Sequence, residues 1–356
     1  MNIAHLRLAN QHIIDHSFAQ AEEVVAWLGA MQGQDYSGTL WSIGLRMKDV
    51  TEPIVEQALA DRRIVRTWPM RGTLHFVAAQ DVRWLLHLLT PRMIAQSAGR
   101  YRQLALDEAT FAASQGVFIN VLQGGKQLTR EDLYQQLEQA KIATAGQRGY
   151  HLLGRAAQDG LICFGAPSGK QQTFTLLDEW IPPTKPLLRE EALAELARRY
   201  FTSHGPATLA DLMRWAGITT AEAKMGLVAV EKELIHEALD GLVYWMAPNI
   251  IDTPLNPTDL YLLPGFDEYI LGYGKRDAVL DPAYAQAICP GGNGVFSPTI
   301  VLNGRVVGTW KRVLKKDKVL ITPTPFQPLT DAERETLAAA AERYAVFLGL
   351  SWATPS

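Results

Sequence analysis

Cysteine is scarce in this sequence, with only Cys163 and Cys289 among 356 residues. Two cysteines cannot build a disulfide framework, and these two are not spaced like the ligands of a zinc site. Apolar runs of the roughly 20 residues that span a membrane are also missing. The first thirty residues do not place a basic head before an apolar run, as a signal peptide does. We therefore expect plain thiols, no membrane segment and a cytoplasmic location.

An excess of positive charge is also absent, since the formal net charge is −3. A protein that coats nucleic acid without specificity needs many clustered cations, so any contact with DNA has to be local. Two basic clusters meet that need: residues 62–71 hold four arginines and no acid, and residues 305–318 hold six cations with only Asp317. A solvated face is an equally good explanation for either cluster.

What the chain does have is length and apolar content. A hydrophobic share of 47 % over 356 residues predicts two or three domains with real cores.

The middle of the chain has the clearest pattern of elements. Gly124 stops a first helix, Thr129 looks like the N-cap of a second, and Gly160 ends a third before two short apolar runs. The expected order is helix 111–122, helix 131–141, helix 147–158, strand 161–164 and strand 173–177. Three helices followed by a hairpin is the order of a winged helix.

The same order recurs on both sides of this unit. Downstream, helices at 190–204, 208–217 and 220–233 precede apolar pieces at 234–236 and 242–246. Upstream the pattern is looser: Ser17 and Gln20 resemble a capping box, and a helical stripe runs from Ala21 to Leu28. Helices near 39–47 and 53–60 follow, then hairpin arms at 64–68 and 73–77 around a turn at 69–72.

Beyond Pro248, many prolines separate short apolar runs, which favours strands in a small sheet or barrel. Asn303 and Gly304 suit a two-residue hairpin turn, and a closing helix is expected at 331–348. We therefore expect a mainly helical α+β fold with three winged-helix units and a β-rich end. The regions are 1–105 with the first unit, 106–185 with the second, 186–250 with the third, and 251–356 with the β-rich region and closing helix.

The most unusual stretch runs from Met31 to Asp35. Continuing the apolar stripe by four places from Leu28 reaches Gln32, so an amide stands where packing would favour an apolar side chain. Gly33 looks like the left-handed residue that ends the helix. Gln32 and Gln34 would then flank one tight turn and converge on a water or a flipped nucleotide. The alternative is that both amides satisfy helix-end carbonyls.

Four segments spread along the chain carry a resemblance to a known family. They are LGAMQGQDYSGTLWSIGLRM, RTWPMRGTLHFV, LLPGFDEYILGYGKR and VLNGRVVGTWKR. Together they resemble the winged-helix alkylpurine DNA glycosylases of the AlkZ and YcaQ type. The resemblance implies three tandem winged helices in a C-shaped arrangement with an added β region. It also implies a catalytic Gln-x-Gln motif, which Gln32 and Gln34 match.

The implied reaction is hydrolysis of the N-glycosidic bond of an alkylated purine, chiefly an N7-substituted guanine and including crosslinked lesions. Alkylation at N7 puts a positive charge on the base, which then leaves neutral, so strong acid catalysis is unnecessary. Amide carbonyls suffice to place a water and stabilise charge at the sugar. Gln34 would orient the water and Gln32 would support it. The expected partner is double-stranded DNA that contains alkylated purines, and we expect a monomer without a cofactor.

Two carboxylates are supporting candidates. Asp35 follows the motif directly and would act as a general base, although Asp35 or Ser37 serves equally well as the N-cap of the next helix. Asp267 and Glu268 are expected in a short strand, where neighbours point to opposite faces. Only Asp267 is therefore kept as a site candidate.

The remaining candidates would contact DNA. They are Arg66, Trp68, Arg71, Thr73, His75, Arg148, Arg305, Lys311 and Arg312. Core packing explains Trp68 at least as well as stacking on DNA. His12 and His16 lie four apart without an evident third ligand, so we expect no metal.

Two functions without catalysis compete with the glycosylase. A winged-helix regulator would need a dimerisation element and a strongly basic recognition helix, and neither is clear in the sequence. An assembly module that binds protein is compatible with the acidic net charge. The fold alone does not choose among them.

Overall fold

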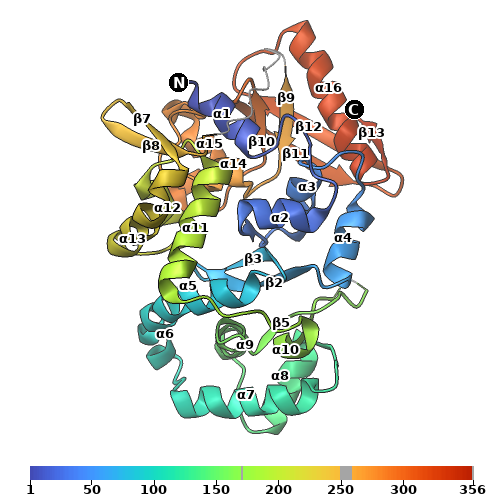
Figure 1. Ribbon diagram of the computed structural model, residues 1–356. Helices are drawn as coiled ribbons and strands as arrows, with labels where there is room; N and C mark the ends of the chain where they lie inside the picture. Colours follow the sequence, from blue (N-terminus) through green and yellow to red (C-terminus); the bar gives the residue numbers. More distant parts are fainter. Residues whose placement is uncertain (170, 249–258, 355–356) are drawn as a thin grey trace. The chain divides into compact units, whose positions relative to one another are not determined.

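The computed structural model describes residues 1–169, 171–248 and 259–354, and these form two compact units with a mixed α+β fold (Figure 1). Unit 1 comprises Met1–Glu56 and Ala194–Ser356, and unit 2 comprises Gln57–Leu193. The expected start of the β-rich region at residue 251 and the prolines at 254 and 257 lie outside the described residues.

The N-terminal part of unit 1 carries four helices and one short strand. They are α1 (Ile3–Asn10), α2 (Ala21–Leu28), β1 (Met31–Gln32), α3 (Tyr36–Gly44) and α4 (Glu52–Ala60), whose end belongs to unit 2. Helix α2 forms where its apolar stripe predicts it, and Ala21, Val24, Val25 and Leu28 are all buried. The expected capping box of Ser17 and Gln20 is wrong. The N-cap is Gln20, whose backbone N–H donates to Glu23, while Ser17 Oγ contacts His12.

The end of α2 also differs from the sequence-based prediction. Gly29 has φ 79° and terminates the helix, whereas Gly33 does not have a positive φ. The helix therefore stops four residues earlier than expected, because the first glycine after the apolar stripe already provides the left-handed backbone. Gln32 consequently lies in β1 and not on a continued helix face.

The second part of unit 1 begins with three helices and a hairpin. The elements are α11 (Arg189–His204), α12 (Leu209–Ala216), α13 (Thr220–Val230), η1 (Glu231–Glu233), β7 (Ile235–Leu239) and β8 (Leu242–Met246). Thr208 and Thr219 cap α12 and α13 through capping boxes with Asp211 and Glu222. This order of elements is the expected one.

A five-stranded sheet and a closing helix follow. Their elements are β9 (Leu260–Leu263), α14 (Glu268–Leu271), η2 (Pro282–Tyr284), α15 (Ala285–Ile288), η3 (Pro290–Gly292), β10 (Thr299–Leu302), β11 (Arg305–Leu314), β12 (Lys318–Pro325), α16 (Asp331–Phe347) and β13 (Ser351–Ala353). The strand order is β13-β12-β11-β10-β9. Asn303 and Gly304, at φ 48° and 78°, make the predicted turn between β10 and β11.

Trp41 joins α3 to this sheet, and Trp310 makes a second hydrogen bond within the sheet itself. Trp41 Nε1 donates to Leu262 O at 2.7 Å, and Trp310 Nε1 donates to Leu263 O at 2.8 Å. Tyr344 of α16 packs edge-on against both rings, at 5.0 and 5.2 Å between centroids. Helix α3 is thereby held against β9 and α16, and the segment before α3 holds Gln32 and Gln34.

The expected strand at Asp267 and Glu268 is wrong. Asp267 is the N-cap of α14 and accepts from Tyr269 N, and Glu268 is the first residue of that helix. An aspartate placed before a short apolar stretch favours this start of a helix.

Unit 2 contains the predicted hairpins and helices. Its elements are β2 (Ile64–Met70), β3 (Thr73–Ala78), α5 (Val82–Gln96), α6 (Ala98–Gln103), α7 (Glu108–Leu122), β4 (Leu128–Thr129), α8 (Arg130–Gln139), α9 (Arg148–Gln158), β5 (Ile162–Phe164), β6 (Thr173–Leu176) and α10 (Leu177–Trp180). Thr129 caps α8 as predicted, with Asp132 completing the box. Trp68 lies in the core and stacks on Phe174 with an interplanar angle of 5°.

Candidate functional site

Gln32 and Gln34 form a contact between their side chains. Gln32 Nε2 donates to Gln34 Oε1 at 2.6 Å, across the single residue Gly33. Gln32 is buried and Gln34 is exposed, so the pair joins the interior of unit 1 to its surface. The two amides therefore lie in direct contact, although the end of α2 does not produce this arrangement.

The backbone around the pair is fixed by α3. Thr39 Oγ1 lies 2.7 Å from Gln32 O and 2.8 Å from Asp35 O. Asp35 is the N-cap of α3, and its side chain accepts from Gly38 N at 3.1 Å. The carboxylate beside the motif thus has a structural partner, as the N-cap alternative predicts.

Asp267 lies on the buried side of the site. Arg46 binds it through two nitrogens at 2.9 Å each, and Ser42 Oγ donates to it at 2.5 Å. Burial alone would raise the pKa of the Asp267 carboxyl, but the Arg46 guanidinium and the hydrogen bonds lower it. The bidentate ion pair ties the N-cap of α14 to Arg46, two residues beyond the end of α3, and Ser42 of α3 adds a hydrogen bond. All these contacts are made inside unit 1, away from solvent.

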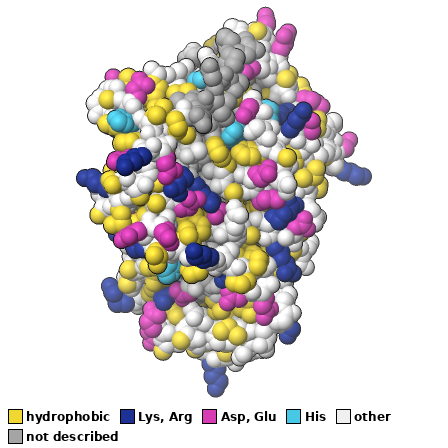
Figure 2. Space-filling model, in the orientation of Figure 1, with side chains coloured by type: hydrophobic (Ala, Val, Ile, Leu, Met, Phe, Trp, Pro, Cys, Tyr) yellow, Lys and Arg dark blue, Asp and Glu magenta, His cyan; other side chains and the backbone are white. Residues whose placement is uncertain are grey.

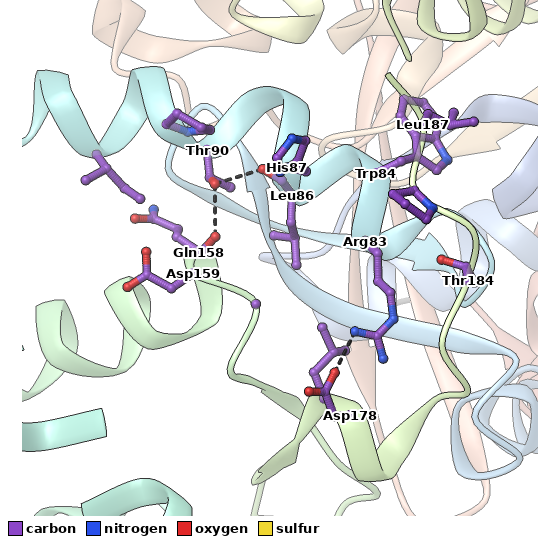
Figure 3. A pocket seen from close by; sticks show the side chains of 15 residues that line it. Arg83, Trp84, Leu86, His87, Thr90, Gln158, Asp159, Asp178, Thr184 and Leu187 are labelled. Atoms are coloured by element: carbon purple, nitrogen blue, oxygen red, sulfur yellow. Dashed lines mark hydrogen bonds and ion pairs between the residues drawn. The ribbon is translucent and has the colours of Figure 1, made fainter. Parts of the chain in front are cut away.

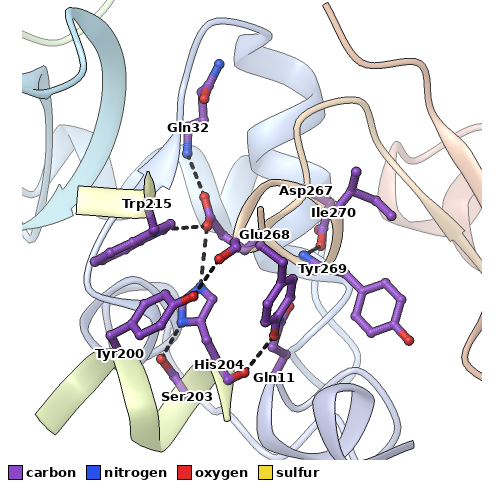
Figure 4. Close-up of polar contacts among 12 residues, drawn as sticks. Gln11, Gln32, Tyr200, Ser203, His204, Trp215, Asp267, Glu268, Tyr269 and Ile270 are labelled. Atoms are coloured by element: carbon purple, nitrogen blue, oxygen red, sulfur yellow. Dashed lines mark hydrogen bonds and ion pairs between the residues drawn. The ribbon is translucent and has the colours of Figure 1, made fainter. Parts of the chain in front are cut away.

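Glu268 is a buried residue that the sequence argument left out. Figure 4 shows its carboxylate between three donors: Trp215 Nε1 at 2.8 Å, His204 Nε2 at 3.4 Å and the backbone N–H of Gln32 at 3.4 Å. Burial lowers the pKa of His204, although the Glu268 carboxylate opposes this. The signal for Glu268 was present in the sequence, as a second acid in the segment that carried the family likeness.

Arg312 is a basic candidate that the fold brings to the motif. Its guanidinium lies 3.9 Å from Asp35 and donates to the hydroxyl of Tyr344. Burial, opposed by Arg312, raises the pKa of Tyr344 to about 12. Arg312 therefore stands next to the residue that follows Gln34.

The other two basic candidates of unit 1 are exposed on β11. Arg305 begins the strand and Lys311 lies next to Arg312 near its other end, so the strand separates Arg305 from the motif. On the face shown in Figure 2, Lys and Arg side chains are interspersed with Asp and Glu. This face therefore mixes charges of both signs.

The candidates in unit 2 are mostly engaged in its interior. Arg66 contacts Gln172 and lies over the ring of Phe164, and Trp68 is in the core. His75 is buried between Thr73 O and Arg71. Burial and the Arg71 charge lower the pKa of His75 to about 3. For Trp68 the structure shows the core packing that was the alternative to stacking on DNA.

Arg148 makes backbone contacts at the start of α9. Its Nε donates to Ala143 O at 2.9 Å, and its Nη1 donates to Leu104 O and Ala105 O. These contacts of Nε and Nη1 join the segment before α7 to the segment after α8.

Unit 2 also contains a cavity of about 760 Å³ that no sequence motif predicted (Figure 3). Its walls include Trp84, His87 and Gln158, and Arg83 pairs with Asp178 at 2.6 Å. Thr90 Oγ1 bonds to two backbone carbonyls, Leu86 O and Gln158 O. None of the sequence-predicted site residues lines this cavity.

Within residues 1–169, 171–248 and 259–354, no group of three or more His, Cys, Asp or Glu side chains is arranged to hold a metal ion. His12 instead contacts Asp15 and Ser17, and His16 contacts Leu45 O and Arg343. In the same ranges no helix has both the length and the apolar character to cross a membrane.

The chain is similar to known proteins in sequence and in fold. The model of a family described as DNA glycosylase AlkZ-like matches residues 25–347. A protein of Streptomyces sahachiroi named interstrand DNA cross-link repair glycosylase is 28 % identical over 361 residues, covering 94 % of each chain. The solved structure of Streptomyces sahachiroi DNA glycosylase AlkZ is similar in fold, with a TM-score of 0.84 and 24 % identity over 99 % of this chain and 98 % of that chain.

Proposed function

The chain belongs to the AlkZ-like DNA glycosylase family, and from this premise we propose that it hydrolyses the N-glycosidic bond of N7-alkylated purines, chiefly N7-alkylguanine, in double-stranded DNA. As a member of this family the protein is a DNA glycosylase, which decides against the regulator and the assembly module. The observation that carries the proposal is the 2.6 Å contact between the buried Gln32 and the exposed Gln34.

The chemistry of the substrate explains why two amides are enough. An N7-alkylated purine carries a positive charge and leaves as a neutral base, so the leaving group needs no strong acid. The enzyme has to hold a water at the sugar and stabilise the positive charge that develops there, and oriented amide dipoles do both. Gln34, at the surface, orients the water, and Gln32 orients Gln34. A base in duplex DNA must also be exposed by flipping or distortion.

Asp35 is proposed only as a supporting residue. Its side chain is partly exposed and lies near Arg312, but it also caps α3. Asp267 is buried and accepts hydrogen bonds from Arg46, Ser42 and Tyr269 N. Its proposed role is therefore to stabilise the fold around the site.

We assign DNA backbone contacts to Lys311, Arg312 and Arg305 on β11, because two of these cations are exposed and the third adjoins the motif. The helix-helix-helix-hairpin orders of α7 to β6 and α11 to β8 support winged-helix units. The name of the Streptomyces relative supports a further substrate class, DNA with interstrand crosslinks. We propose that the enzyme acts as a monomer and releases the base without cutting the strand.

The test is release of base from a duplex that contains N7-methylguanine. Wild type releases the base and leaves an abasic strand that breaks only after alkali. Gln34→Ala loses about 100-fold or more in single-turnover rate, as loss of one preorganised group commonly does. Gln123→Ala, at an exposed glutamine of unit 2, is the matched control and keeps the wild-type rate.

Two outcomes would contradict the proposal. Undiminished release by Gln34→Ala would remove Gln34 from the reaction. No release by the wild type from this duplex or from a crosslinked one would refute the substrate class and leave the family membership intact.

A further inference from the structure

Glu268 contacts the glutamine pair through the backbone of Gln32. In Figure 4 the Gln32 side chain extends away from the carboxylate, and the printed contact is from Gln32 N to Glu268 Oε1 at 3.4 Å. We infer that Glu268 is a positioning residue of the glycosylase site: held by Trp215 and His204, it fixes the Gln32 peptide and places negative charge behind the glutamine pair. This inference rests on the proposed function, because it assigns the pair to catalysis.

Glu268 and the neighbouring acid, Asp267, have different partners. Asp267 is paired with the guanidinium of Arg46, whereas the ion pairs of the described residues give Glu268 only His204. Burial lowers the pKa of His204. The Glu268 carboxyl is held by hydrogen bonds from Trp215 and His204, whereas Asp267 is held by a guanidinium. The nearest buried cations in unit 1, Arg7 and Arg46, are engaged with Tyr273 and Asp267.

The Gln32 peptide is held on both sides. Glu268 accepts from its N–H, and Thr39 Oγ1 donates to its carbonyl at 2.7 Å. β1 is only two residues long, so its own backbone hydrogen bonds are few. The contacts with Glu268 and Thr39 therefore supply much of the restraint on the Gln32 backbone. With the peptide fixed, the Gln32 side chain keeps its direction toward Gln34.

The charge of Glu268 also suits the reaction. Positive charge grows on the sugar as the base leaves, and a carboxylate in a water-excluded region stabilises it over a longer distance than in water. Glu268 contributes this effect from beneath the pair, without contact with the DNA.

The experiment compares Glu268→Gln with Tyr269→Phe in the full-length protein. The first change keeps the side-chain volume but removes the charge, and the new NH2 group opposes the donors Trp215 or His204. The second removes a buried hydroxyl of the same helix that binds Ala4 O and Gly304 O, remote from Gln32. Three readouts are taken: the single-turnover rate on N7-methylguanine DNA, the Kd for the same duplex without damage, and the melting temperature.

We expect Glu268→Gln to slow the single-turnover rate about 10- to 100-fold with a Kd within about threefold of wild type, since a charge-assisted hydrogen bond is lost. Tyr269→Phe lowers the melting temperature and keeps the rate. A Glu268→Gln rate within about threefold of wild type, or one no lower than that of Tyr269→Phe, overturns the inference. If wild type itself releases no base, the proposed function has failed first.

A second variant covers the case in which Glu268→Gln does not fold. Trp215→Phe removes one donor to Glu268 and keeps an aromatic ring against Tyr200. We expect its single-turnover rate to fall about threefold to tenfold with an unchanged Kd. A wild-type rate in this variant overturns the inference.

Discussion

Gln32 and Gln34 are joined side chain to side chain, with Gln32 Nε2 2.6 Å from Gln34 Oε1. A free glutamine side chain loses considerable rotamer entropy when it is ordered. The mutual hydrogen bond, together with the anchored Gln32 peptide, meets part of that cost before DNA arrives. For the proposed reaction, which depends on the placement of a water, the pair is therefore preorganised.

The contacts of His16 predict that the protein loses stability in mild acid. Its Nδ1–H donates to Leu45 O, and its Nε2 accepts from Arg343, so a second proton has no acceptor. Burial and the Arg343 charge lower the pKa of His16 to about 4. Because the folded pKa is below the unfolded value of about 6.5, the stabilisation is complete above pH 6.5 and is lost as the pH falls toward 4.

The measurement is urea unfolding between pH 7 and pH 4.5. Wild type should lose on the order of 2 kcal/mol over the range in which His16 titrates. His16→Asn should lack this part of the pH dependence, and asparagine tolerates the φ of 47° at this position. Parallel curves for the two proteins would contradict the assignment.

The Arg46 and Asp267 pair predicts strong coupling between α3 and α14. Both side chains are buried, so Asp267→Asn should destabilise unit 1 by about 3–5 kcal/mol, because it leaves an uncompensated guanidinium. Adding Arg46→Met should restore part of the loss. Denaturant unfolding of both single variants and the double variant measures the coupling, and purely additive losses would show that the pair does not act as a unit.

The lowered pKa of Asp267 also predicts how the stability of the protein depends on pH in acid. A carboxyl with a folded pKa below its unfolded value of about 3.9 stabilises the protein fully above that pH and loses its contribution below it. Between pH 5 and pH 3, the stability of wild type should therefore fall more steeply than that of Asp267→Asn. Equal slopes would show that the ion pair does not hold this pKa down.

Gly29 predicts a backbone effect at the start of the site segment. At φ 79° and ψ −49°, an alanine is strained, and Gly29→Ala should cost about 1–3 kcal/mol. Gly116→Ala is the matched control, because Gly116 lies inside α7 with open space around its Cα. That change should be neutral or stabilising by up to about 1 kcal/mol. The midpoints of urea unfolding measure both changes. A wild-type midpoint for Gly29→Ala would show that the end of α2 accommodates alanine without strain.

Lys311 predicts the salt dependence of DNA binding. If it contacts a phosphate, Lys311→Ala should weaken binding to undamaged duplex and reduce the slope of log K against log salt by about 0.9. Lys126→Ala, at an exposed lysine of unit 2, is the control and should keep the wild-type slope. An unchanged slope in Lys311→Ala would remove this residue from the DNA interface.

Local signals predicted the helices and turns well. Thr129, the apolar stripe of α2 and the Asn303-Gly304 turn depend on interactions within a few residues, so the sequence shows them directly. The prediction was wrong where two signals compete nearby. Gly29 and Gly33 are both able to end α2, and the nearer glycine does so.

The candidate site was predictable only in part. The Gln32 and Gln34 pair was singled out by extending the apolar stripe of α2 to Gln32, which the structure places in β1 instead, and family likeness added its role. Glu268 was not found, because its importance comes from Trp215 and His204, more than fifty residues away in the chain. Pairing the acids by strand geometry selected Asp267, which is the N-cap of a helix.

The sequence by itself determined many of the helices, the caps at Thr129 and Thr208, and the turn at Asn303 and Gly304, because each depends on residues close together in the chain. Only the tertiary structure decided which groups surround the glutamine motif. Contacts between α3, α11, α12 and α14 place Arg46, His204, Trp215 and Glu268 around the Gln32 segment. Burial then removes water from these charged groups, so their hydrogen bonds and ion pairs become strong enough to fix the site.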